Sequence, residues 1–192
     1  WQDAYPDLQD ALEMAATYGD AREIWVAAGT YRPDGGTGNR EAAFRLVSDV
    51  AVYGGFDGTE TQLEERRPHG HPTILSGDIG VADEPSDNSH HVIIADGVSS
   101  TAILDGFFVT GGNTSGASNP SGGGICITNG QPVIRNCVIR NNTGGVYCDL
   151  SDATIRNCII RDNTGTERGA GIGCEDCNPA IYSCTIAGNI AS

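Results

Sequence analysis

Between positions 125 and 189 the chain repeats one pattern of alternating apolar and polar residues three times. The central segments 132–142, 153–163 and 179–189 read PVIRNCVIRNN, ATIRNCIIRDN and PAIYSCTIAGN. Each has a cysteine in the middle and apolar residues two positions apart, a spacing that places side chains on one face of a β-strand. The three cysteines lie 21 and 26 residues apart. A repeat of this length indicates a stack of similar coils.

Each repeat unit holds three short strand patterns and no helical segment between them. This predicts an all-β fold, a right-handed parallel β-helix of about seven coils. Successive coils stack about 4.8 Å apart, so equivalent residues form ladders. The expected internal ladders are Ile134, Ile155 and Ile181; Cys137, Cys158 and Cys184; and Ile139, Ile160 and Ile186.

Only two residues separate each ladder isoleucine from the ladder cysteine that follows it, so the chain has to turn between them. Asparagine suits such a corner because it tolerates the left-handed backbone conformation. Stacked asparagine side chains also hydrogen-bond from coil to coil. The predicted corners are Asn136, Asn157 and Ser183, and a second set at Asn142, Asn163 and Asn189.

The pattern extends upstream in a weaker form. Segment 102–112 aligns with the repeat when Gly106 takes the cysteine position, with Ile103 before it and Phe108 after it. Earlier strands are expected in segments 23–33, 44–58, 73–80 and 91–97.

Residues 1–20 are predicted to form an N-terminal cap helix, because an open coil end has unpaired strand edges that need cover. The helical stripe ends at Gly19, and residues 21–192 are assigned to the coils. No capping pattern follows the last repeat, so the coils are expected to continue beyond Ser192 in the native protein or to pack there on another chain. The apolar residues of the stripe are Leu8, Ala11, Leu12, Ala15 and Ala16.

The charge balance narrows the classes of partner. The chain has 25 acidic and 11 basic residues, a net charge of −14, and all of its basic residues are arginine. This balance disfavours binding to nucleic acid, whose phosphates require a basic surface, and to an anionic membrane. No apolar stretch is long enough to span a bilayer.

Two sets of segments resemble known protein families. GGGI (122–125) with IRNN (139–142) resembles the Gly-Gly-Ala-Ile and Phe-x-x-Asn repeats of chlamydial polymorphic outer membrane proteins, with isoleucine in place of phenylalanine. DLQDALEMA and EIWVAAGTYRP near the N-terminus resemble secreted bacterial pectin-lyase-like β-helix proteins. The resemblance covers nearly the whole chain and implies a β-helix that is secreted or at the cell surface. It does not decide function, since this fold hosts lyases, hydrolases, adhesins and spacers.

Arginines provide the candidates for catalysis. A lyase acting on an acidic polysaccharide needs a base and often calcium, and without lysine the base would be Arg135 or Arg156. Stacked arginines repel unless an anion lies between them. That anion is either a substrate carboxylate or a neighbouring acid such as Asp162, and we expect the neighbour or solvent. Arg140 and Arg161 form a second expected stack.

Acidic residues provide the candidates for metal binding. Asp149 and Glu175 occupy equivalent positions of adjacent coils, with Asp152 and Asp176 nearby. They are calcium candidates, although a solvated acidic face is the favoured interpretation because calcium sites gather more carboxylates in one loop. No other cofactor is expected.

Cysteines and histidines offer weaker candidates for chemistry. Cys174 and Cys177 form a Cys-x-x-Cys pair that lacks the two further ligands of a zinc site. The ladder cysteines are expected to be buried free thiols, while Cys148 and Cys174 stack and could form a disulfide. Surface positions are expected for the histidines, which are His69, His71, His90 and His91.

The leading interpretation is a non-catalytic module for adhesion, glycan contact or spacing, with a polysaccharide or a surface protein as partner. The alternative is a lyase or glycoside hydrolase acting on an acidic polysaccharide. A glycosidase needs a pair of carboxylates, and the chain has no adjacent aspartates. Only Tyr147 and Tyr182 are expected as aromatic residues on the outward faces of the repeats.

Overall fold

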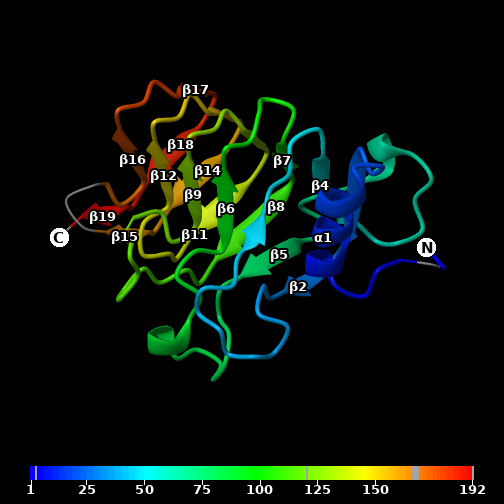
Figure 1. The fold of residues 1–192 in the computed structure, drawn as a ribbon, viewed down its shortest axis with the longest axis horizontal. Coiled ribbons are helices and arrows are strands. Elements are labelled where there is room, and N and C mark those ends of the chain that lie inside the picture. Colours follow the sequence, from blue (N-terminus) through cyan, green and yellow to red (C-terminus); the bar gives the residue numbers. More distant parts are fainter. Residues whose placement is uncertain (3, 120, 166–168, 192) are drawn as a thin grey trace.

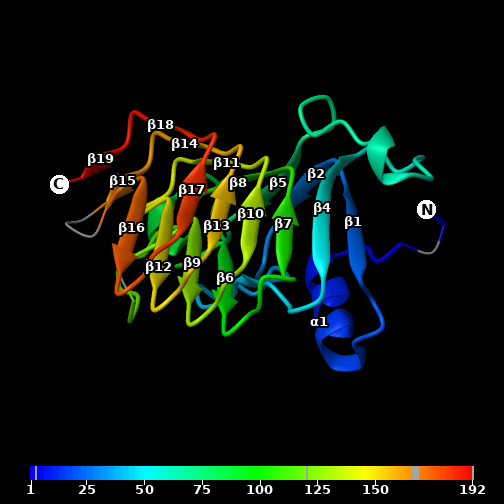
Figure 2. The same cartoon turned by 90° about the horizontal axis from the view of Figure 1, so that it is seen from above.

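The computed structural model describes residues 1–2, 4–119, 121–165 and 169–191. All its strand pairs are parallel, and they stack into a coil with one helix at its N-terminal end (Figures 1 and 2). The predicted all-β solenoid with an N-terminal helical cap is therefore confirmed. In the described part of the chain, two of the three large sheets have six strands and the third has five, which gives fewer coils than the seven that the sequence suggested.

Three sheets form the sides of the coil. Sheet A consists of β1 (Glu23–Ala27), β4 (Ala51–Phe56), β7 (Ile103–Asp105), β10 (Val133–Arg135), β13 (Thr154–Arg156) and β17 (Ala180–Tyr182). Sheet B consists of β2 (Gly29–Tyr31), β5 (Thr73–Ser76), β8 (Phe107–Thr110), β11 (Val138–Arg140), β14 (Ile159–Arg161) and β18 (Thr185–Ala187). Sheet C consists of β3 (Phe44–Arg45), β6 (Ile93–Asp96), β9 (Ile125–Thr128), β12 (Val146–Asp149) and β16 (Ile172–Glu175). A short pair, β15 (Thr164–Gly165) with β19 (Ile190–Ala191), completes the last coils, and the loops carry the 3₁₀ turns η1 (Leu63–Glu65) and η2 (Pro85–Asp87).

Helix α1 (Leu8–Tyr18) covers the N-terminal end of the coil. Asp7 caps it by accepting a hydrogen bond from the Gln9 amide at 3.0 Å, and Gly19 ends it in the left-handed conformation with φ 67°. Its buried residues are Leu8, Leu12 and Ala15, whereas Ala16 of the predicted stripe is exposed. Among the described residues, no helix has the length and apolar character that crossing a membrane requires.

The interior consists of stacked apolar side chains. The strand registers pair Ile134 with Ile155 and Ile155 with Ile181, and they place the second isoleucine ladder, at 139, 160 and 186, in the same way. Ile155 is fully buried, but Ile181 is 41% exposed because no described coil covers it. The same holds for Ile186 and Ile190.

The upstream alignment is wrong by one residue. Leu104, not Ile103, pairs with Ile134, and Val109 pairs with Ile139, so Phe107 takes the place that was expected for Gly106. Gly106 instead forms the corner, with φ 86°. Because side chains alternate along a strand, this shift places Ile103 and Phe108 on the outer side.

The backbone conformation at the corners explains why asparagine recurs there. Asn136, Asn157 and Ser183 all have φ 54°, the left-handed conformation that the first corner predicts. At the second corner the left-handed residue comes one position earlier than expected, at Asn141, Asp162 and Gly188.

The predicted second-corner asparagines instead turn into the coil and form a hydrogen-bonded ladder. Asn142 Nδ2 donates to Asn163 Oδ1 at 3.0 Å, and Asn163 Nδ2 donates to Asn189 Oδ1 at 2.9 Å. The same Asn163 Oδ1 accepts the backbone amide of Asn142 at 3.1 Å. Each interior amide thus satisfies backbone groups that water does not reach.

All seven cysteines are free thiols. Cys137 and Cys158 are each 1% exposed and pack with the apolar core, while Cys184 in the last coil is half-buried. Cys148 and Cys174 pair in register without a bridge. Burial raises the pKa of Cys126 and the pKa of Cys174 to about 11, which lowers the thiolate fraction at neutral pH.

Replacing a ladder isoleucine with a charged residue should prevent or severely weaken folding. Ile155→Asp places an unpaired carboxylate in the interior and should reduce the free energy of unfolding by at least about 4 kcal/mol, measured by urea denaturation. Ile159→Asp is the matched control, because Ile159 is 37% exposed on the outer side of β14 and should lose less than about 1 kcal/mol. Equal stability of the two variants would contradict the inward register.

The asparagine ladder should tolerate no loss of its donors. Asn163→Asp places a carboxylate against the carbonyl oxygens of Ile139 and Asn189, which now accept from Nδ2 at 3.1 and 2.9 Å. We expect a loss of about 2–4 kcal/mol at neutral pH, and a smaller loss in acid, where a protonated carboxyl regains one donor. Asn157→Asp, at an exposed corner where aspartate also tolerates a positive φ, should stay close to the parent in the same urea titration.

The thiols should remain unbridged in solution. Mass analysis after alkylation of the unfolded, unreduced protein should find all seven cysteines modified. In the folded protein the exposed Cys174 should react much faster than Cys137 or Cys158, because the latter two are buried. A bridge between Cys137 and Cys158 would overturn the packing described above.

Candidate functional site

One line of outward side chains runs across sheet A from coil to coil, and we call it the outer column of sheet A. In the order of the strands it contains Trp25, Tyr53, Asp105, Arg135, Arg156 and Tyr182. It combines aromatic, acidic and basic side chains on a rigid support. It also includes both arginines that the sequence offered as catalytic candidates.

A buried carboxylate lies at the centre of this column. Asp105 is 1% exposed, and its oxygens contact Arg66 Nη2 at 2.8 Å, Arg135 Nε at 2.6 Å and Asn136 Nδ2 at 2.8 Å. Arg66 comes from the loop between β4 and β5 and also lies over the ring of Tyr53, 5.1 Å from its centroid. Asp105 therefore ties this loop to the sheet, and sequence reasoning missed it because the upstream register was one residue out.

The pairing with Asp105 changes the interpretation of Arg135. The anion beside this arginine is a neighbouring acid, as expected, but it is Asp105 and not Asp162. Guanidinium groups hold their proton in proteins. The geometry therefore assigns Arg135 a structural contact and makes it a poor proton acceptor.

Arg156 is in a different position. It lies one strand beyond Arg135, is half-buried, and forms no ion pair with any residue that the structure describes. Its other neighbour, Tyr182, is 50% exposed. This end of the column therefore presents a cation beside an accessible aromatic ring.

The second arginine stack lies on sheet B. Arg140 lies over the ring of Phe108, 6.0 Å from its centroid, and Arg161 forms an ion pair with Asp162. Asp162, which was expected to be an anion beside the stacked arginines, therefore pairs with Arg161. Both stacks flank the corner formed by Asn136 and Asn157.

The calcium candidates lie on sheet C and in the turn that follows it. Asp149 pairs in register with Glu175, whose Oε2 accepts a hydrogen bond from the Tyr147 hydroxyl at 2.5 Å. Asp152 Oδ1 accepts the amide of Asn178 at 3.2 Å, and Asp176 forms a left-handed turn. Within the described ranges, no three His, Cys, Asp or Glu side chains are grouped to hold a metal ion. Calcium binding at these positions stays a prediction.

Two further expectations about the surface are wrong. Tyr147 is only 3% exposed and packs directly against Gly122, so it offers no ring on the outer face. His90 is buried with Nδ1 3.1 Å from Asn113 O, and Nδ1 of the half-buried His91 lies 3.1 Å from Gly122 O. Burial lowers the pKa of His91, which favours its neutral form. Both histidines hold the loop between β8 and β9 in place, while His69 is exposed as expected.

Comparison with known proteins supports the architecture. A family model described as a right-handed beta helix region matches residues 85–192, which is more than half of the chain. No curated protein and no solved structure matches the chain significantly. The matched segment contains Asp105, Arg135, Arg156 and Tyr182, together with the three repeats from which the fold was predicted. The chain therefore belongs to the right-handed β-helix family.

Proposed function

We propose that this β-helix is a non-catalytic module of a secreted or cell-surface protein and that it contacts an acidic polysaccharide through the outer column of sheet A. The observation that carries the proposal is Arg156, which lies beside the exposed ring of Tyr182 and has no carboxylate partner among the described residues. The resemblance of the sequence to bacterial surface β-helices supports the secreted or surface location in this proposal.

The chemistry of this pair suits a sugar acid. A guanidinium group donates two parallel hydrogen bonds to a carboxylate, and an aromatic ring packs against the apolar face of a sugar. Because the coil is rigid, the two groups are already in place before the glycan binds.

The charge distribution directs an acidic glycan to this region. The net charge of −14 repels a polyanion over most of the surface. Four of the eleven arginines, however, lie on the two stacks around the corner between sheets A and B, and they are Arg135, Arg140, Arg156 and Arg161. Arg135 and Arg161 are paired with Asp105 and Asp162, so Arg140 and Arg156 supply the attraction, since neither forms an ion pair with a described residue.

A non-catalytic role fits the state of the acidic group in the column. The Asp105 carboxylate forms ion pairs with two guanidinium groups and accepts hydrogen bonds from Arg135 Nε and Asn136 Nδ2, so its oxygens are occupied and shielded from solvent. A general acid or base has to reach its substrate within hydrogen-bond distance. Asp105 therefore holds the loop between β4 and β5 against sheet A, and Arg156 is the group in the column that contacts the glycan carboxylate.

The proposal predicts that binding to polygalacturonate depends on Arg156. In a titration at low salt, Arg156→Gln should weaken binding about fivefold, which corresponds to about 1 kcal/mol for a partly exposed charge contact. Arg45→Gln removes the same charge from an exposed position on sheet C and should leave the affinity unchanged. Added salt should weaken binding of the parent.

Two results would contradict this proposal. Equal loss of affinity in Arg156→Gln and Arg45→Gln would show that the glycan responds to the total charge of the protein and not to Arg156 in the outer column. Ultraviolet absorbance from unsaturated products in a screen of acidic polysaccharides would instead identify the protein as a lyase, the alternative function.

A further inference from the structure

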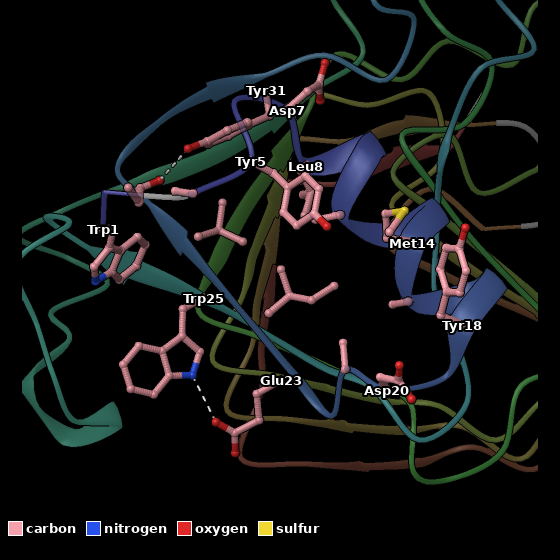
Figure 3. Close-up of a pocket in the computed structure, with 17 residues that line it drawn as sticks. Trp1, Tyr5, Asp7, Leu8, Met14, Tyr18, Asp20, Glu23, Trp25 and Tyr31 are labelled. Carbon is pink, nitrogen blue, oxygen red and sulfur yellow. Dashed lines mark hydrogen bonds between the residues drawn. The ribbon is translucent and has the colours of Figure 1, made fainter.

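A groove at the N-terminal end of the coil lies between α1, the segment that holds Trp1, and strand β1. Its volume is about 860 Å³, and apolar and aromatic side chains form most of its walls (Figure 3). Four of these residues are exposed to solvent: Trp1 by 42%, Tyr5 by 54%, Met14 by 41% and Tyr18 by 64%. Soluble proteins seldom gather so many exposed apolar groups in one place without a partner.

The floor of this groove is the edge of a sheet. Strand β1 is the outermost strand of sheet A, and no described strand pairs with it on the side away from β4. The carbonyl of Arg22 points toward β4, because it accepts a hydrogen bond from the amide of Ala51. The backbone groups of successive residues in a strand point to opposite sides, so the N–H and C=O groups of Glu23 and Trp25 point away from β4. An unpaired strand edge is a template for a further strand.

The charged side chains of the groove are acidic. Among the described residues they are Asp7, Asp20 and Glu23, and none of the described lining residues is an arginine or a histidine. Arg22, the nearest basic residue along the chain, points to Asp49 with its Nη1 3.6 Å from Oδ2. Glu23 Oε2 accepts a hydrogen bond from Trp25 Nε1 at 3.0 Å, which holds one carboxylate at the floor.

We propose that this groove binds an extended peptide segment of a partner protein that carries alternating basic and apolar side chains. The segment adds to β1 as a new strand through the free backbone groups of Glu23 and Trp25. Because side chains alternate along a strand, its basic side chains lie on the outer face with Glu23 and Trp25 and near Asp20, and its apolar side chains lie on the other face, against Ile24 and the apolar side chains of α1. This interaction is independent of the glycan contact proposed above, because it uses the opposite charge and a different end of sheet A.

Synthetic peptides test each part of the proposal. The probe is acetyl-Lys-Val-Lys-Val-Lys-amide, and its counterpart carries glutamate in place of every lysine. Both tryptophans of the chain line the groove, so tryptophan fluorescence reports occupancy directly. We expect saturable binding of the lysine peptide, at least about tenfold tighter than that of the glutamate peptide at low salt.

A third peptide separates strand addition from simple attraction. Methylation of its backbone nitrogens on one edge removes the donors but keeps the charge and the side chains, and it should weaken binding about tenfold. Undiminished binding of this peptide would overturn strand addition. Equal binding of the lysine and glutamate peptides, or no saturable change with either, would overturn the proposed partner.

Matched variants of the protein test whether the peptide binds in the groove. Glu23→Gln keeps a hydrogen-bond acceptor for Trp25 Nε1 but removes the negative charge. The double variant with Asp20→Asn should bind the lysine peptide about fivefold more weakly than the parent protein does. Asp83→Asn, at an exposed turn far along the chain where asparagine tolerates the positive φ, should leave the affinity unchanged. An equal loss in both cases would place the peptide elsewhere.

Discussion

Each coil has to return to the level at which the next strand can pair, because parallel strands hydrogen-bond only when their backbones stay in register. The interior asparagines meet this requirement at the second corner. Asn163 Oδ1 accepts from both the backbone amide and the side chain of Asn142, so the coils are joined where no strand runs. The repeat units differ in length, at 21 and 26 residues, yet both sides of the longer unit pair in register. The added residues, around positions 166–170, therefore leave the path of the coil unchanged, and three of them lie outside the described residues.

The same register decides which residues meet on the outside. Inward ladders leave the alternate positions in outward columns, so like charges stack wherever the repeat contains an arginine. Asp105 relieves this repulsion on one side of the arginine stack by pairing with Arg135 and with Arg66 from a distant loop. Arg156 has no such partner among the described residues. The two arginines occupy equivalent positions of the repeat, but their neighbours on the adjacent strands differ. Arg135 lies beside Asp105 on β7, whereas Arg156 lies between Arg135 and Tyr182.

The sequence predicts the repeats well and the contacts of the loops poorly. Ladders and corners are local patterns, and three nearly identical segments supply the same register three times. Upstream, Gly106 resembles the cysteine position because glycine and cysteine are both small, but its positive φ makes it a corner residue and shifts the strands by one. The burial of Tyr147 and His90 depends on the path of a loop, which no periodicity describes. The pairing of Arg66 with Asp105 joins residues 39 apart in the chain and has no local signal.

The outer column and the N-terminal groove lie on one sheet and share Trp25, yet their charges are opposite. Glu23 and Asp20 make the groove acidic, whereas Arg156 makes the far end of the column basic. Four strand steps separate β1 from β13, which is roughly 19 Å at the ordinary interstrand spacing. This distance exceeds the screening length of about 8 Å at physiological ionic strength. The charges of the two surfaces are therefore screened from each other, and the stack of strands keeps the two surfaces apart without a domain boundary between them.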